Sequence, residues 1–170
     1  MTSVLVYVVD WLPPDFGAVG QYGLANARAA AQAGRGTTLI GLTSGPSGRT
    51  VEHFEGGATL TIIRLHAPPT GKGSYLRRLL WALMADLRLV WTAARTPCPR
   101  GSELLFTGSP PFMLFFAIWL KAFRGFRLTY RITDFYPEVI IAALGKTPAP
   151  LALLQRLAWW ARRRRRGGAR

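Results

Sequence analysis

The feature of this sequence that most constrains its fold is a strand, a glycine-bearing loop and a helix that follow one another near the amino terminus. Residues 4–9 are apolar and mostly β-branched or aromatic, which is typical of a buried strand. The chain then passes Pro13 and Pro14 and several glycines, and becomes an alanine-rich run that stops at Gly34. Such a unit leaves the first N–H groups of its helix available to an anion such as a diphosphate. We therefore expect the rest of the chain to be built around this unit.

Strand and helix patterns alternate downstream, which predicts an α/β fold: a Rossmann-like parallel sheet with helices on both faces. The turn-rich segment 43–57 is expected to lead into a hairpin or neighbouring strand rather than a long helix. In the segment 74–94, apolar residues recur at helical spacing and Ser74 can cap the helix. The further strands are expected at 37–42, 59–65, 103–107 and 127–132, and the further helices at 112–123 and from Pro137.

The length of 170 residues suits a single core, so we expect one domain over residues 1–161 and a disordered basic tail over 162–170. The net charge of +14 favours anionic partners, although six of the 22 basic residues lie in that tail. Basic residues with interleaved aromatics in a nucleic-acid-binding motif are absent, so we expect no nucleic acid partner. The single cysteine, Cys98, excludes an internal disulfide and favours a reducing compartment.

Targeting and membrane-spanning segments are not predicted. The first residues lack the basic region and the cleavage site of a signal peptide. The apolar stretch 104–120 is interrupted at 108–111, and residues 112–120 would span only about 14 Å as a helix, against about 30 Å of hydrocarbon. We expect a cytoplasmic protein.

Acidic residues are few, and four of them follow two predicted parallel strands: Asp10, Asp15, Asp134 and Glu138. Both loops should open on the edge of the sheet where ligands bind in such folds. As the alternative, Asp10 and Asp134 only cap turns and Glu138 only serves the start of a helix. The spacing of the glycines from Gly17 differs from the dinucleotide fingerprint, which argues against an NAD site.

Three segments together resemble the amino-terminal domain of family-4 glycosyltransferases. They are DWLPPDFGA from Asp10, GSPP from Gly108, and DFYPE from Asp134, which AALG follows at 142–145. The similarity is closest to the bacterial branch that builds surface polysaccharides and O-antigens, and it extends to about Leu157. It implies the amino-terminal half of a GT-B fold, in which two Rossmann-like domains face each other across the active site.

The resemblance implies retaining transfer from a nucleotide-sugar donor to a lipid-linked or saccharide acceptor, without a metal or another cofactor. It implies Asp134, Glu138 and Asp10 as the catalytic residues. The residues that would approach the donor diphosphate are then Gly17, Gly20 and Gln21. In this family a carboxy-terminal domain grips the donor, whereas this sequence ends in an arginine run. We therefore expect the chain to be inactive alone.

The sequence leaves alternatives open. The first possibility is that the chain is such a domain. It could also be a non-catalytic subunit that pairs with a separate donor-binding chain, or a module that binds the anionic inner face of the cell membrane. The last alternative is a nucleotide-binding protein unrelated to sugars. Residues 151–166 form either an interfacial basic helix or an ordinary connecting helix before a solvated arginine run. His53 and His66 lack metal-ligand spacing, and Ser109 lies outside any nucleophile elbow.

Overall fold

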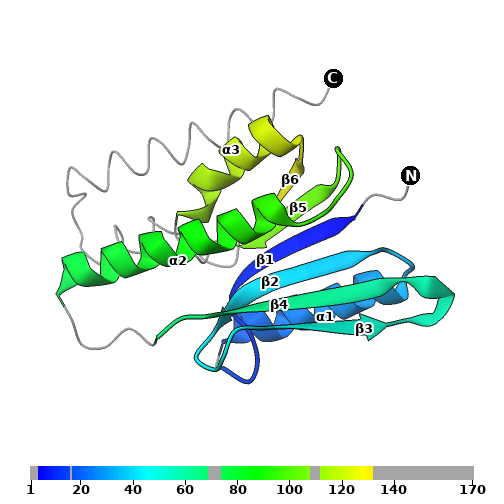
Figure 1. The fold of residues 1–170 in the computed structure, drawn as a ribbon, viewed down its shortest axis with the longest axis horizontal. Coiled ribbons are helices and arrows are strands. Elements are labelled where there is room, and N and C mark those ends of the chain that lie inside the picture. Colours follow the sequence, from blue (N-terminus) through cyan, green and yellow to red (C-terminus); the bar gives the residue numbers. More distant parts are fainter. Residues whose placement is uncertain (1–3, 16, 69–73, 108–111, 132–170) are drawn as a thin grey trace.

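The computed structural model of the chain describes residues 4–15, 17–68, 74–107 and 112–131. Strand and α-helix alternate along these residues, as the sequence predicts, except between β2 and β4 (Figure 1). The elements are β1 (Leu5–Trp11), α1 (Ala18–Gln32), β2 (Thr37–Thr43), β3 (Gly48–His53), the short 3-10 helix η1 (Glu55–Gly57), β4 (Thr59–His66), α2 (Tyr75–Arg95), β5 (Glu103–Thr107), α3 (Met113–Arg124) and β6 (Arg127–Arg131).

The strands form one six-stranded sheet in the order β3-β4-β2-β1-β5-β6. All neighbouring strands are parallel except β3, which runs antiparallel to β4. Strand β1 lies inside the sheet and is buried from Leu5 to Val9, because it has a neighbour on each side and packed side chains on each face. The prediction of an α/β fold with a Rossmann-like, mostly parallel sheet is thus confirmed.

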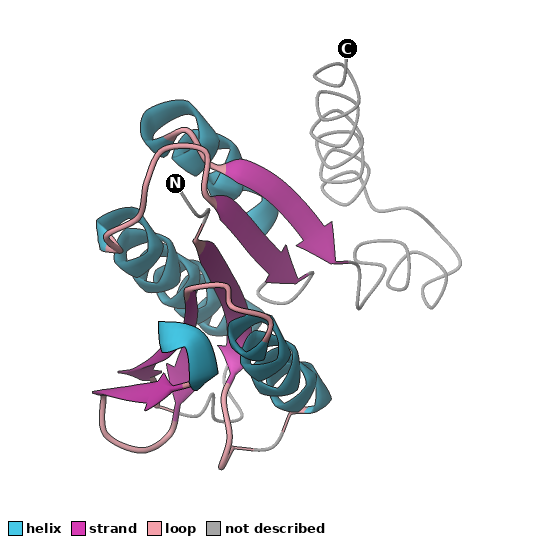
Figure 2. Ribbon diagram, turned by 90° about the vertical axis from the view of Figure 1, so that its right-hand side faces the viewer, coloured by secondary structure: helices cyan, strands magenta, loops and turns pink. Residues whose placement is uncertain are grey.

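Helices cover both faces of the sheet (Figure 2). Helix α1 packs on one face, where its Ala27 and Ala31 join a core with Leu5, Tyr7 and Val9 of β1. Helices α2 and α3 pack on the other face over Val6 and Val8, whose side chains point the opposite way along the same strand. The alternation of β1 side chains therefore divides the core into two layers.

Helix α1 lies unusually close to the end of β1. A Cβ atom added at Gly20 would stand 1.7 Å from the backbone oxygen of Trp11, and one added at Gly23 would stand 2.7 Å from Val9 Cγ1. Only glycine leaves room for such an approach. Gly34 has a φ of 82° just beyond the helix, so the predicted glycine stop is confirmed.

Helix α2 begins after Ser74, whose hydroxyl accepts the backbone N–H of Arg77, so the predicted cap is confirmed. Its Ala85, Leu89 and Ala93 are buried against the sheet. Most of the apolar residues that reveal the helix in the sequence lie instead on its outer side. These residues, exposed by 38% to 62%, are Leu76, Leu79, Leu80, Met84, Leu87 and Trp91.

Two predicted boundaries are wrong. Strand β3 pairs antiparallel with β4, which confirms the expected hairpin, but its position within the segment predicted as turn-rich is new, because an exposed edge strand lacks a buried apolar face. Strand β1 continues to Trp11, so Asp10 lies within the strand rather than in the loop after it. The helix from Pro137, the GSPP segment and residues 151–170 lie outside the described residues.

Candidate functional site

The candidate site lies at the carboxyl ends of β1 and β5, where the direction of the sheet connections changes. Strand β1 pairs with β2 on one side and with β5 on the other. The chain leaves β1 toward α1 on one face, whereas β5 leads to α3 on the opposite face. Open α/β sheets bind their ligands at such a topological switch point. Asp10 and Trp11 are the last two residues of β1, so they lie beside this switch point.

An aromatic pair borders this end of β1. The ring of Trp11 stacks on the ring of Trp81 from α2, with 5.9 Å between centroids and 12° between planes. The indole N–H of Trp81 donates to the backbone oxygen of Pro68 at 3.1 Å. Because Trp11 follows the half-buried Asp10 in the strand, the stack fixes α2 against the strand end that carries the carboxylate.

The predicted diphosphate residues all lie at the start of α1. Gly17 is the N-cap without a side-chain cap, Gln21 is exposed, and its backbone N–H donates to Gly17 O at 3.2 Å. The N–H groups of the first turn point out of the helix without helical acceptors, as in every α-helix. Gly20 is buried against Trp11 O, so the structure brings the start of α1 to the strand end that holds Asp10. Close packing alone already requires glycine at position 20.

Asp15 serves a structural purpose. Its carboxylate accepts the Thr43 hydroxyl at 2.8 Å, the Ser44 N–H at 2.9 Å and the Ser44 hydroxyl. These bonds join the loop before α1 to the end of β2. Mainly through the two Ser44 hydrogen bonds, they lower the pKa of Asp15 below its ordinary value. Asp15 therefore ties two segments together, a contact that the sequence pattern does not predict.

Asp86 of α2 is a candidate that the sequence did not indicate. It is fully buried, and its Oδ2 accepts the backbone N–H of Phe112 at 2.8 Å, at the start of α3. Its Oδ1 has no hydrogen-bond partner within the described part of the chain. Burial raises the pKa of Asp86 to about 7, and the bond from Phe112 only partly opposes this rise. A carboxyl that titrates near neutral pH can take up and release a proton under physiological conditions.

The sequence pattern does not single out Asp86, because this residue lies in the middle of a helix and not in a loop after a strand. One signal was present. The other charged residues of that helix are all arginines. The single acidic residue among them therefore indicates a position whose surroundings differ from those of the exposed arginines. The remaining predicted catalytic residues, Asp134 and Glu138, lie outside the described residues, and their convergence with Asp10 stays a prediction.

Features that would bind a metal ion or span a membrane are lacking in the described part of the chain. Across residues 4–131, leaving out the gaps in the description, no three His, Cys, Asp or Glu side chains are grouped so that they could hold a metal ion. His66 instead places Nδ1 2.8 Å from the backbone oxygen of Gly45. Over these residues no helix combines the length and the apolar character needed to cross a bilayer.

Neither the models of protein families, nor the curated proteins, nor the solved structures contain a match to this chain. Function is therefore inferred from the three sequence motifs and from the switch point that Asp10 borders.

Proposed function

We propose that this chain is the acceptor-side domain of a retaining, nucleotide-sugar-dependent glycosyltransferase of polysaccharide or glycoconjugate synthesis. The observation that carries the proposal is the position of Asp10 at the carboxyl end of β1, beside the switch point of a mostly parallel sheet. A fold alone does not specify a function, so the substrate class comes from the resemblance of the three motifs to family-4 enzymes.

The proposed chemistry needs two kinds of group. When a diphosphate leaves a sugar, positive charge develops at the sugar, and a nearby carboxylate and fixed phosphate donors stabilise the transition state. Asp10 supplies a carboxylate toward the acceptor hydroxyl, and the start of α1 at Gly17, Gly20 and Gln21 faces the diphosphate. In the proposal Asp134 and Glu138 complete the acidic set, and the donor is bound by protein outside these 170 residues.

The test is the binding of a lipid-linked acceptor, with a short-chain polyprenyl-diphosphate-linked monosaccharide as the probe and titration calorimetry as the measurement. Loss of a charge-assisted hydrogen bond in Asp10→Asn should weaken binding about tenfold. The matched control is Glu55→Gln, an exposed carboxylate in η1, which should leave the affinity unchanged.

Equal affinities for Asp10→Asn and the wild type would contradict the role of Asp10. Turnover of a nucleotide-sugar by this chain alone, at ordinary enzyme rates, would contradict the assignment of donor binding to another protein segment. The binding measurement tests the role of Asp10, and the turnover measurement tests where the donor binds. The same protein preparations serve for both.

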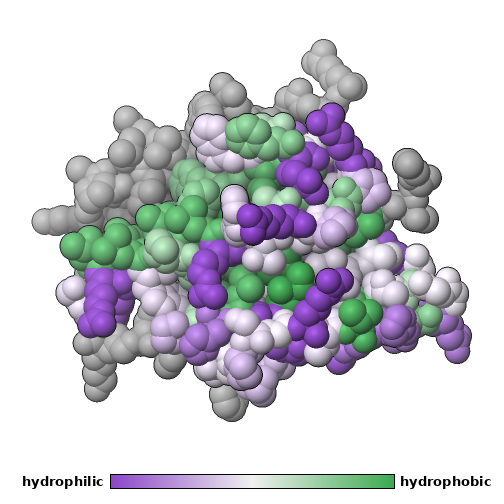
Figure 3. All heavy atoms as spheres, in the orientation of Figure 1, coloured by the Kyte–Doolittle hydropathy of each residue, from purple (hydrophilic) through white to green (hydrophobic). Residues whose placement is uncertain are grey.

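A second candidate function, docking on an anionic membrane, is favoured by the outer side of α2. In Figure 3, hydrophobic side chains gather along the part of α2 at the left of the view. The exposed charged residues of this helix are all arginines: Arg77, Arg78, Arg88 and Arg95. An amphipathic helix with an apolar face and flanking arginines is the kind that lies in the interface of an acidic bilayer. This surface would place the domain at the inner face of the cell membrane, where lipid-linked acceptors are.

Vesicle sedimentation tests this candidate. The wild type should pellet with vesicles containing phosphatidylglycerol and stay in solution with phosphatidylcholine alone. The double variant Leu80→Gln, Met84→Gln should lose most of the bound fraction. The control Tyr22→Ser, which removes an exposed large side chain from α1, should not. Binding that survives the α2 changes would exclude this helix as the docking surface.

A further inference from the structure

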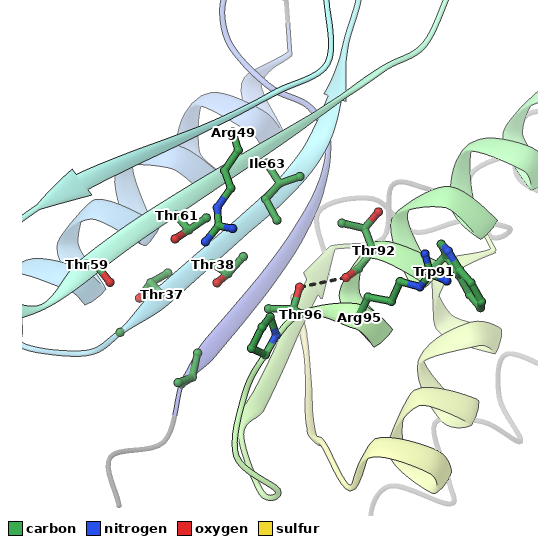
Figure 4. Close-up of a pocket in the computed structure, with 13 residues that line it drawn as sticks. Thr37, Thr38, Arg49, Thr59, Thr61, Ile63, Trp91, Thr92, Arg95 and Thr96 are labelled. Atoms are coloured by element: carbon green, nitrogen blue, oxygen red, sulfur yellow. Dashed lines mark hydrogen bonds between the residues drawn. The ribbon is translucent and has the colours of Figure 1, made fainter.

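A cavity of about 470 Å³ lies at the opposite edge of the sheet, where the strands begin. It opens between β4 and β2 on one side and the last turns of α2 on the other (Figure 4). Among the residues that line it are six threonines: Thr37, Thr38, Thr59, Thr61, Thr92 and Thr96. The candidate site at Asp10 lies at the other end of the strands, so the cavity is separate from it.

Strand register explains why hydroxyl groups gather here. Val6 of β1 pairs with Thr38 of β2, and Thr38 pairs with Thr61 of β4, so the three side chains form one row on one face. Val6 belongs to the core that α2 covers, together with Leu89. The row therefore changes from apolar to hydroxyl side chains at the point where the cavity opens.

Three of these hydroxyls are available to a ligand. Those of Thr37, Thr92 and Thr96 donate to backbone oxygens at 2.8 to 3.0 Å. Those of Thr38, Thr59 and Thr61 form no hydrogen bond with any residue that the structure describes. Hydroxyl groups that both donate and accept suit a ligand that carries hydroxyls itself.

The charge of the cavity is positive. Arg49 of β3 pairs with Ile63 of β4, and Figure 4 shows its guanidinium beside Thr38 and Thr61. This guanidinium forms no ion pair or hydrogen bond within the described part of the chain. Arg95 lies at the outer side with its guanidinium carbon 4.1 Å from the centroid of the Trp91 ring.

Carboxylates do not offset this charge. The described residues that line the cavity include neither Asp nor Glu. The nearest acidic residues in the register, Glu52 and Glu103, form ion pairs with Arg28 at 2.7 Å and Arg35 at 2.8 Å. An anion that enters the cavity would therefore meet guanidinium and hydroxyl donors without a competing carboxylate.

We propose that this cavity binds a small phosphorylated polyol, the chemical class of the sugar phosphates. The guanidinium of Arg49 pairs with the phosphate, and the hydroxyls of Thr38, Thr59 and Thr61 bond to those of the polyol. The volume lies within the range of about 300–1,000 Å³ that is usual for small-molecule sites. The site goes beyond the proposed transferase function and does not depend on it.

The experiment is titration calorimetry of the full 170-residue chain with glucose 1-phosphate, glucose and inorganic phosphate. We expect saturable binding of one glucose 1-phosphate per chain, and binding at least about tenfold weaker for each of the other two probes. Arg49→Gln should weaken glucose 1-phosphate binding about tenfold, and Arg95→Gln about threefold because its guanidinium lies at the rim. The control Arg78→Gln, an equal charge change at the exposed other end of α2, should leave the affinity within about twofold.

A second pair of variants separates ligand contact from folding. Thr38→Val and Thr61→Val keep the side-chain volume, and each should weaken binding about fivefold while the urea midpoint stays within its error. The proposal is overturned if the folded wild type shows no saturable binding, if Arg49→Gln and Arg78→Gln have equal affinities, or if inorganic phosphate or glucose binds as tightly as glucose 1-phosphate.

Discussion

Helices α1 and α2 flank the same sheet, yet they meet it in opposite ways. The residues that α1 buries are all small, namely Gly20, Gly23, Ala27 and Ala31, and two of them touch the strand below. Among its apolar residues, helix α2 buries little more than Ala85, Leu89 and Ala93, and it turns most of its large apolar side chains outward. The difference teaches that apolar periodicity locates a helix, whereas small residues at helical spacing show which side approaches the sheet.

The largest expected effect on stability comes from Asp86, the charged residue on the buried side of α2. The pKa of Asp86 is raised to about 7, so the folded chain holds this proton more tightly than the unfolded chain, whose pKa is near 3.8. The free energy of unfolding should therefore fall as the pH rises from about 4 to 7, by about 4 kcal/mol. Asp86→Asn should remove this slope and be more stable than the wild type at pH 8. Urea unfolding at a series of pH values measures both.

A wild-type stability that stays level between pH 4 and 7 would show that Asp86 is not desolvated in solution. The asparagine keeps an oxygen that accepts the Phe112 N–H, so the comparison isolates the charge rather than the hydrogen bond.

The next effect tests the close approach of α1. Gly20→Ala places a methyl group where the Trp11 backbone oxygen stands, and backbone cannot move aside as a side chain can. We expect a loss of about 3 kcal/mol in the free energy of unfolding, although alanine favours helix by about 1 kcal/mol. Urea unfolding followed by circular dichroism measures it. Ala29→Leu, on the exposed side of α1, is the control and should change stability by less than about 0.5 kcal/mol.

A smaller effect should come from the loop that anchors α1. Asp15→Ala removes three hydrogen bonds to Thr43 and Ser44 and should cost about 1–2 kcal/mol at pH 7. The pKa of Asp15 is lowered, so its contribution is present above pH 4 and is lost as the pH falls through the folded-state pKa. A double-mutant cycle with Ser44→Ala checks the pairing. Additive losses would contradict it.

The smallest effect is expected on the outer side of α2. Met84→Gln exchanges an exposed apolar side chain for a polar one, so stability should change by less than about 0.5 kcal/mol in the same urea assay. A loss above about 2 kcal/mol would instead show that this side of the helix is covered in the folded chain, which would remove the contrast with α1.

The sequence predicts most of the scaffold because its strands are buried and its helices have clear ends. The predicted strand 103–107 coincides with β5, and Ser74 and Gly34 mark helix ends that the structure confirms. The position of strand β3 was not predicted, because an exposed edge strand has no apolar face to reveal it. The orientation of α2 was equally hidden, since periodicity does not show which side meets the sheet.

The candidate site was predictable only in part. Asp10 and the start of α1 follow from the order of strand, loop and helix. Asp86 becomes a candidate only through burial and its contact with Phe112, which is 26 residues away in the chain. The cavity at Arg49 depends on strand register across β3, β4 and β2, and local sequence carries no record of that register.

The stacked indoles of Trp11 and Trp81 give the molecule an optical consequence. Two nearly parallel chromophores, one on β1 and one on α2, couple their electronic transitions, and this coupling adds to the circular dichroism spectrum only while both elements hold their places. A change in that signal on adding a compound would report, without any label, that the strand end beside Asp10 has moved relative to α2.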